Sequence, residues 1–76
     1  MKYLRNEKVL KAFGKRLKSL RLSQNISQAQ LAFECDLNVT QVARIERGEV
    51  NTSICHVAAL AKALGVNSKE LFDFEY

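Results

Sequence analysis

The chain has 76 residues, of which 47% are hydrophobic and 26% charged, as in small soluble globular domains. No apolar run approaches the roughly 20 residues that a membrane-spanning helix needs, and the basic N-terminus lacks the apolar stretch of a secretory signal. Composition therefore excludes a membrane protein. It favours one cytoplasmic domain over residues 1–76, with a core at about 8–72, a short basic N-terminal extension and an aromatic C-terminal tail.

Positive charge is concentrated near the N-terminus. The formal net charge is +4, and eight of the 12 basic residues lie within residues 1–21, where Glu7 is the sole acid. Residues 22–76 hold four basic and seven acidic residues. A basic face favours polyanions such as nucleic acid, although a run of Lys and Arg is also compatible with a solvated helix face.

The cysteines and the single histidine give little support to a metal site or an enzyme. Cys35 and Cys55 form no C-x-x-C motif and are expected to stay reduced, and a structural metal would need three or four ligands near His56. There is also no glycine-rich phosphate loop and no evident nucleophile partner for the histidine. We therefore expect no metal, no cofactor and no catalysis.

Helix signals recur along the whole chain and predict an all-α fold, because proline is absent and no segment alternates like a strand. The first helix is expected to begin near Asn6 to Lys8 and to end at about Ser23, with Asn25 stopping it. Gly14 inside this helix requires either close packing or an exposed surround. The apolar face of the helix is formed by Leu10, Phe13, Leu17 and Leu20.

Two short helices are expected around a turn at Asp36. Ser27 caps the first of them with Gln30 as a capping-box partner, and Leu31, Ala32 and Cys35 point inward. Asn38 caps the second, where Leu37 and Val42 form a hydrophobic staple, and Gly48 ends it. Val42, Ile45 and Glu46 share the inner side of this second helix, and its outer side carries Thr40, Ala43, Arg44 and Arg47.

The C-terminal third predicts two further helices. Ser53 caps a helix that ends at Gly65, and Asn67 caps a short one with Glu70 as its box partner, burying Leu71 and Phe72. The longer helix is expected to bury Ile54, Val57, Leu60, Ala61 and Leu64.

The segments Q-A-Q-L-A and V-A-R-I-E-R-G, with flanking G-K-R-L-K-S-L-R and A-L-A-K-A-L-G-V-N-S-K-E-L-F, resemble the Cro/phage-repressor family of helix-turn-helix domains. The resemblance covers about residues 10–72. It implies a five-helix bundle whose second and third helices form the helix-turn-helix. It also implies a homodimeric, sequence-specific regulator of transcription that binds double-stranded DNA.

Site residues follow from the resemblance and from the outer side of the third helix, which would enter the major groove. Base contacts are expected from Val39, Thr40 and Arg44. Arg21 and Glu46 match a partly buried ion pair of the family. The residues expected to contact phosphate are Gln28, Asn38, Arg47, Asn51 and Thr52.

Three positions depart from the family pattern. Asp36 stands where the turn glycine is usual, and Thr52 stands where proline is frequent. Phe33 replaces a charged residue on the outward face of its helix, which suggests burial against the N-terminal tail or a partner.

A dimer interface is expected on the outer side of the fourth helix and on the aromatic tail, because so small a chain buries only about 60% of its unfolded surface alone. The alternative is that the tail folds back on its own domain. The candidate interface residues are Cys55, Ala59, Ala63, Phe72, Phe74 and Tyr76.

Several kinds of regulator remain open. A phage-type repressor or a restriction-modification controller would act alone, whereas an antitoxin would also hold a toxin protein through the tail or Phe33. A protein-interaction adaptor without DNA binding is conceivable, because Glu34, Asp36 and Glu49 lie near the expected DNA face.

Overall fold

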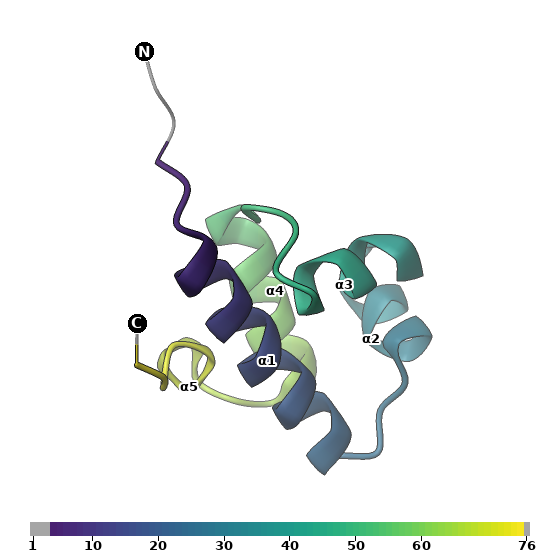
Figure 1. The fold of residues 1–76 in the computed structure, drawn as a ribbon. Helices are drawn as coiled ribbons and strands as arrows, with labels where there is room; N and C mark the ends of the chain where they lie inside the picture. The colour runs from purple at the N-terminus through teal and green to yellow at the C-terminus, as the bar shows by residue number, and fades with distance from the viewer. Residues whose placement is uncertain (1–3, 76) are drawn as a thin grey trace.

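The computed structural model describes residues 4–75, and within this range the chain forms five helices and no strand (Figure 1). The all-α, five-helix prediction is confirmed. None of the described helices is long and apolar enough to cross a membrane. The helices are α1 (Glu7–Ser23), α2 (Gln28–Glu34), α3 (Val39–Glu46), α4 (Ile54–Leu64) and α5 (Ser68–Leu71).

Each helix begins at a polar residue whose side chain accepts a hydrogen bond from a first-turn amide, which satisfies a donor that the helix cannot. The N-caps are Asn6, Ser27, Asn38, Ser53 and Asn67. Complete capping boxes form at α3 and α5. The capping box predicted for α2 is only half formed. The Ser27 side chain accepts from the Gln30 backbone amide, but the Gln30 side chain does not accept from the Ser27 backbone amide.

A residue with left-handed backbone follows four of the helices, and after α4 it is Gly65 with φ of +67°. Asn25 and Asp36 both have φ of +57°, and Gly48 has φ of +74°. Asp36 is therefore the turn residue between α2 and α3, as predicted, and Asn25 prevents α1 from continuing.

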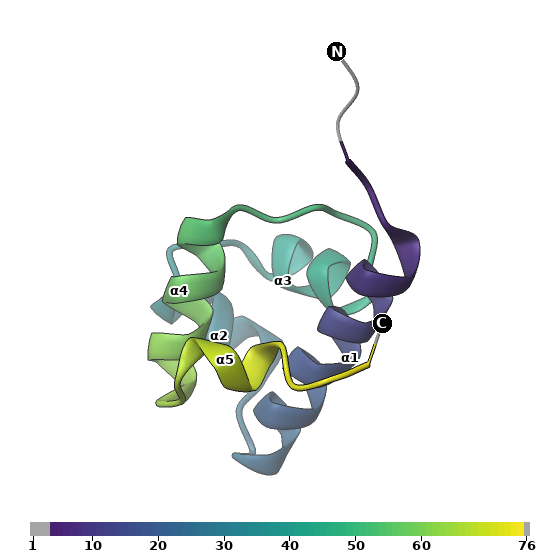
Figure 2. The same cartoon turned by 90° about the vertical axis from the view of Figure 1, so that its left-hand side faces the viewer.

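The core lies where α1 and α4 enclose the α2–α3 pair. Its largest fully buried side chains are Leu17, Leu31, Val42, Leu60 and Leu71. Figure 2 shows that α5 follows α4 and that the segment after α5 returns to α1. The Arg16 guanidinium on α1 donates to the Glu70 carbonyl on α5 at 2.7 Å. This hydrogen bond connects the last helix to the first.

Two burial predictions were wrong. Ile54 is 87% exposed and Phe72 is 47% exposed. Ile54 has the spacing of the buried face of α4, but it lies in the first turn, at the edge of an open groove rather than in the core. The Phe72 ring lies against Phe13 and Phe74, with centroid separations of 5.4 and 6.2 Å, and keeps one side open.

Gly14 is the point where α1 crosses the end of α3. A Cβ atom there would lie 2.4 Å from the Glu46 carbonyl oxygen and 2.6 Å from that of Ile45. Close packing, rather than an exposed surround, therefore explains this glycine, because only hydrogen fits between the two backbones.

Candidate nucleic-acid interface

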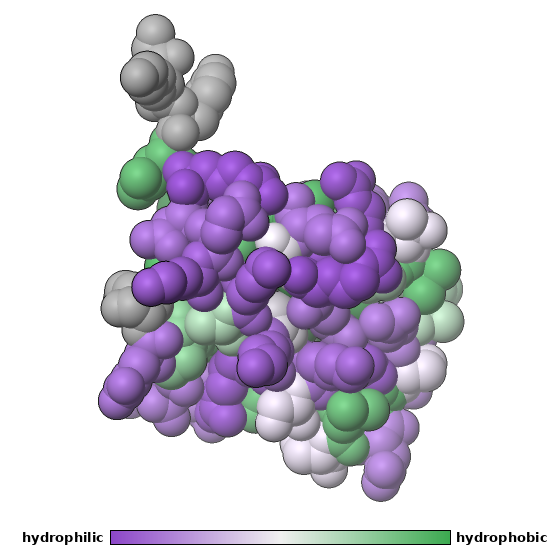
Figure 3. All heavy atoms as spheres, viewed as in Figure 1, coloured by the Kyte–Doolittle hydropathy of each residue, from purple (hydrophilic) through white to green (hydrophobic). Residues whose placement is uncertain are grey.

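Helix α3 has one buried and one exposed side. Val42, Ile45 and Glu46 are buried, whereas Thr40 and Arg44 on the other side are exposed. Viewed from the side that carries α1 and α3, the surface of the described residues is largely hydrophilic (Figure 3). The residues predicted to read bases thus share a solvent-facing surface, which Val39, itself 46% exposed, extends at the first turn.

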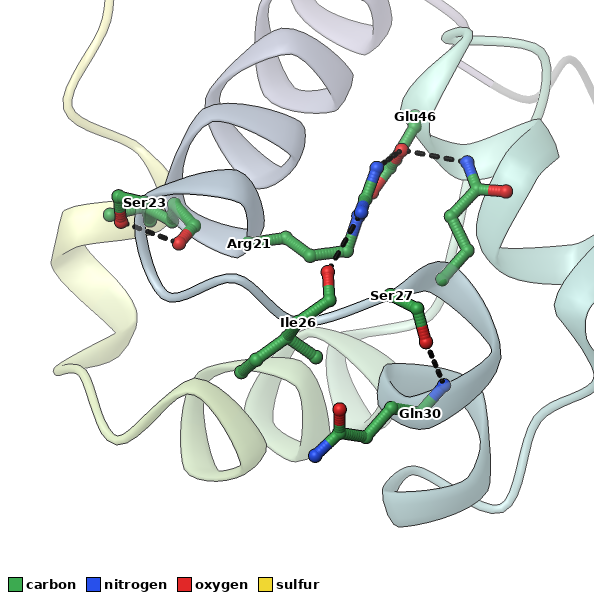
Figure 4. Close-up of polar contacts among 8 residues, drawn as sticks. Arg21, Ser23, Ile26, Ser27, Gln30 and Glu46 are labelled. Carbon is green, nitrogen blue, oxygen red and sulfur yellow. Dashed lines mark hydrogen bonds and ion pairs between the residues drawn. The ribbon is translucent and has the colours of Figure 1, made fainter.

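A buried polar cluster holds α3 against α1 (Figure 4). Arg21 Nε and Nη2 donate to the two carboxylate oxygens of Glu46 at 2.6 and 3.0 Å, and both residues are buried. Arg21 Nη1 also donates to the Ile26 carbonyl at 2.8 Å. A planar fork on a carboxylate fixes orientation as well as distance, so this pair sets the angle of α3 relative to α1.

Gln28 belongs to the same cluster. Its Nε2 donates to Glu46 Oε1 at 2.9 Å, so the carboxylate receives three hydrogen bonds, two from Arg21 and one from Gln28. The side-chain amide of Gln28 is thereby oriented by α3, and a second N–H on the same nitrogen remains for another acceptor.

Glu49 lies beside the exposed arginines of α3. Arg47 Nε donates to Glu49 Oε2 at 2.5 Å and Arg47 Nη2 to Glu49 Oε1 at 3.3 Å. Arg44 Nε lies 3.6 Å from Glu49 Oε1. The hydrogen bond from Arg47 holds the pKa of the Glu49 carboxyl below its ordinary value, and the pKa of Arg47 is raised by the same bond. The sequence did not lead us to predict that Glu49 pairs with both arginines, although Arg47 and Glu49 stand only two positions apart.

The loop between α3 and α4 is tied to the segment before α1. The Arg5 guanidinium donates to the Glu49 carbonyl at 3.0 Å, and Asn51 Nδ2 donates to the Leu4 carbonyl at 3.2 Å. One N–H of the side-chain amide of Asn51, a residue predicted to contact phosphate, is thus engaged within the chain. The hydroxyl of Thr52 lies 3.5 Å from His56 Nδ1.

A shallow groove of about 320 Å³ separates the exposed side of α3 from the start of α4. Arg44, Asn51 and Thr52 all line it, so the structure brings these three predicted contact residues to one place. Asn38 stands at the other end of α3, where its side chain accepts from the Gln41 amide.

The predicted interface residues are divided between two surfaces. On α4, Cys55 is exposed while Ala59 and Ala63 are half-buried, and Tyr76 lies outside the described residues. Phe72 instead lines a separate, mostly apolar groove of about 160 Å³ with the exposed Ile54 and with Val9. Phe74 is half-buried against the core.

Phe33 is 86% exposed on α2. Its predicted burial against the N-terminal tail is therefore wrong for the part of the tail that the structure describes, residues 4–6. That segment lies instead against residues 49–51.

Both cysteines are free thiols, buried for Cys35 and exposed for Cys55. Burial raises the pKa of the Cys35 thiol, with a smaller contribution from the charge of Glu34. Among residues 4–75, no three His, Cys, Asp or Glu side chains gather as a metal site would require.

Known proteins resemble the chain over most of its length. A family model described as helix-turn-helix matches residues 17–71. The control protein C.BamHI of Bacillus amyloliquefaciens is 49% identical over 63 residues, covering 82% of this chain and 78% of that protein. The immunity repressor protein of Bacillus phage phi105 is 38% identical over 53 residues, covering 70% of this chain and 37% of that protein.

A solved structure agrees with these relatives. The restriction-modification controller protein C.AhdI from Aeromonas hydrophila superposes with a TM-score of 0.82 at 41% identity, covering 83% of this chain and 96% of that one. The buried polar cluster and the exposed side of α3 thus lie in a fold shared with control proteins. The chain belongs to the helix-turn-helix family of the Cro and phage-repressor type, whose members are sequence-specific DNA-binding regulators of transcription.

Proposed function

We propose that this chain regulates transcription in the cytoplasm by binding an operator as a homodimer, with α3 in the major groove. One observation carries the proposal. The buried Arg21–Glu46 pair orients α3 so that its reading side faces solvent. A helix about 10 Å across fits the major groove, where all four base pairs present different edges.

The reading side divides into base contacts and anchors. Arg44 is the main base-reading residue, because the outer edge of a guanidinium matches two acceptors of guanine. Thr40 supplies a hydroxyl to a neighbouring base, and Val39 packs on a thymine methyl. Gln28, held by Glu46, offers its second N–H to a phosphate.

Further phosphate contacts come from both ends of α3. Asn38 stands at the N-terminus of the helix, where first-turn amides and the helix dipole favour anions. Asn51 and Thr52 border the groove beyond Arg44. Arg47 reaches phosphate only after it releases Glu49.

The exposed apolar side chains change where we place the dimer interface, compared with the interface expected from the sequence. Two recognition helices must lie about 34 Å apart to enter successive major grooves, which a two-fold dimer achieves. Ile54 and Phe72 border one apolar groove, so we place the centre of the interface there, with Phe74 and Tyr76 adjacent along the chain. Cys55, Ala59 and Ala63, which lie on a separate surface of α4, stay in the proposed interface as a second contact area.

A restriction-modification controller is the favoured physiological setting. C.BamHI is named a control protein and C.AhdI a restriction-modification controller protein, and both match this chain over most of their length. A toxin partner has no comparable support, and an adaptor without DNA binding is not favoured by a family of DNA-binding regulators. The exposed Phe33 is the residue on which a partner protein would still be tested.

A mobility-shift assay on the DNA upstream of the gene tests the proposal across a salt series. Affinity should fall steeply as salt rises, because phosphate contacts release counterions. Arg44→Ala should cost about 1–3 kcal/mol on the operator and flatten the sequence preference. Lys15→Ala, on the exposed surface of α1, should affect all sequences alike. Absence of any shift at low salt contradicts the proposal.

The dimer is tested by analytical ultracentrifugation of Ile54→Lys. Because Ile54 is exposed, this change leaves the monomer core intact and should convert a dimer into a monomer. Leu22→Lys is the matched control, since Leu22 is 53% exposed at the far end of α1. An interface elsewhere would leave Ile54→Lys dimeric.

A further inference from the structure

We infer that Glu49 is a positioning residue that sets the specificity of DNA binding, by holding Arg47 back from phosphate and presenting Arg44 to the bases. The inference rests on the proposed function. It concerns a residue that lies outside the expected set of DNA contacts and that carries the same sign of charge as DNA.

The two arginines are bound by Glu49 in different ways. Arg47 uses the Nε and Nη2 edge of its guanidinium, with both oxygens of Glu49 engaged. This is the fork that a guanidinium also uses on phosphate, so the carboxylate and a DNA phosphate compete for one set of donors. While the bond is made, these donors are not available to a phosphate.

Arg44 keeps its terminal edge free. The contact with Glu49 is made by Arg44 Nε at 3.6 Å, and no hydrogen bond from the two Nη groups to another residue of the 4–75 range is observed. A carboxylate behind Nε restrains the side chain without occupying the Nη pair, which is the edge that bonds guanine O6 and N7. Glu49 therefore orients one arginine and withholds the other.

The backbone fixes Glu49 in this place. Its amide donates to the Arg44 carbonyl at 3.0 Å, and its carbonyl accepts from Arg5 at 3.0 Å. Gly48, at positive φ, precedes it, and a Cβ there would lie 2.7 Å from the Lys11 Cα. The turn that carries the carboxylate is therefore tied to α1, to α3 and to the segment before α1.

Nonspecific binding depends on phosphate contacts and operator binding adds base contacts, so removal of the Glu49 charge should affect the two differently. Glu49→Gln frees Arg47 for phosphate on any sequence. It also removes the restraint on Arg44, which matters only where a base is read. The ratio of operator affinity to nonspecific affinity should therefore fall.

Fluorescence anisotropy with the full chain tests this inference on an operator duplex and a scrambled duplex of equal length. For Glu49→Gln on scrambled DNA, the plot of log affinity against log salt should steepen by about 0.9, one added phosphate contact. The loss of affinity between about 50 and about 200 mM salt should then grow about three- to fourfold. Operator affinity should gain less than scrambled affinity, or fall.

Asp36→Asn is the matched control for charge alone. Asp36 is exposed at the turn before α3, and within the described chain no cation pairs with its carboxylate. Asn is also well tolerated at its φ of +57°. This variant removes the same charge without freeing an arginine, so it should leave the specificity ratio closer to that of the wild type.

A double-variant cycle tests the route of the effect. In the Arg47→Ala background, Glu49→Gln should no longer steepen the salt dependence. An equal change of both affinities, or a ratio that falls as far in Asp36→Asn, overturns the inference while leaving the proposed function intact. Failure of the wild-type chain to distinguish the operator from scrambled DNA overturns both.

Discussion

Helix α3 ends between two clusters made of the same kinds of side chain. On its inner side Arg21 and Glu46 are buried, with side chains 8% and 2% exposed. On its outer side Arg44, Arg47 and Glu49 are 51%, 57% and 44% exposed. Burial makes the inner pair a fixed part of the fold, because separating it would leave a charge without water. The outer pairs can exchange partners with water, salt or DNA at little cost.

The inner cluster should give the largest effect. Glu46→Ala leaves Arg21 buried without its partner and removes an acceptor of Gln28, so we expect a loss of about 3–5 kcal/mol in the free energy of unfolding. Urea denaturation at one fixed protein concentration measures it. Arg21→Met combined with Glu46→Leu should be less destabilised than Glu46→Ala, because neither charge is then stranded.

Gly14→Ala should come next. The added methyl meets the Ile45 and Glu46 carbonyls, which are backbone atoms that cannot rotate away. We expect about 2 kcal/mol of destabilisation, although alanine favours helix by roughly 1 kcal/mol. Ala12→Gly on the same helix separates the two terms, since it reports propensity and the loss of one methyl without a clash. Stabilisation by Gly14→Ala would show that α3 does not pack as closely as described.

Gln28→Ala should have a smaller effect on stability than on DNA binding. It deletes one of three hydrogen bonds to Glu46, worth about 1 kcal/mol of unfolding free energy. It also removes the proposed phosphate anchor, so affinity should fall for operator and scrambled DNA alike. Urea denaturation and anisotropy on the same samples compare the two. Unchanged DNA affinity would assign Gln28 to the inner cluster alone.

Glu49→Gln should have the smallest effect on stability. The pKa of Glu49 is lowered in the folded protein, so its pairs stabilise the fold above the ordinary carboxyl pKa and lose this effect as pH falls through the folded value. Because the group is exposed, the difference from wild type in urea midpoint should be small at neutral pH and should shrink further as pH falls through the folded pKa of Glu49. A loss as large as that of Glu46→Ala would contradict the distinction between the clusters.

Local chemistry in the sequence was enough to locate every helix. A cap such as Asn38 acts within one turn, and an Asp at position 36 adopts the left-handed backbone without help from distant residues. The apolar spacing of Val42 and Ile45 likewise identified the inner side of α3. Family resemblance added the expectation of the Arg21–Glu46 pair, which is present in the fold, at a separation of 25 positions.

Only the tertiary structure decided which residues meet across elements and how far each face is covered. Ile54 has the spacing of a buried residue, yet it is exposed at the edge of an open groove that it lines with Val9 and Phe72. Gly14 is required because two backbones cross there, and Gln28 is oriented by a carboxylate on another helix. Helical periodicity gives the direction of a side chain, but its partners depend on the packing of the whole chain. For the same reason, the contact of Glu49 with both Arg44 and Arg47 could be found only in the folded protein.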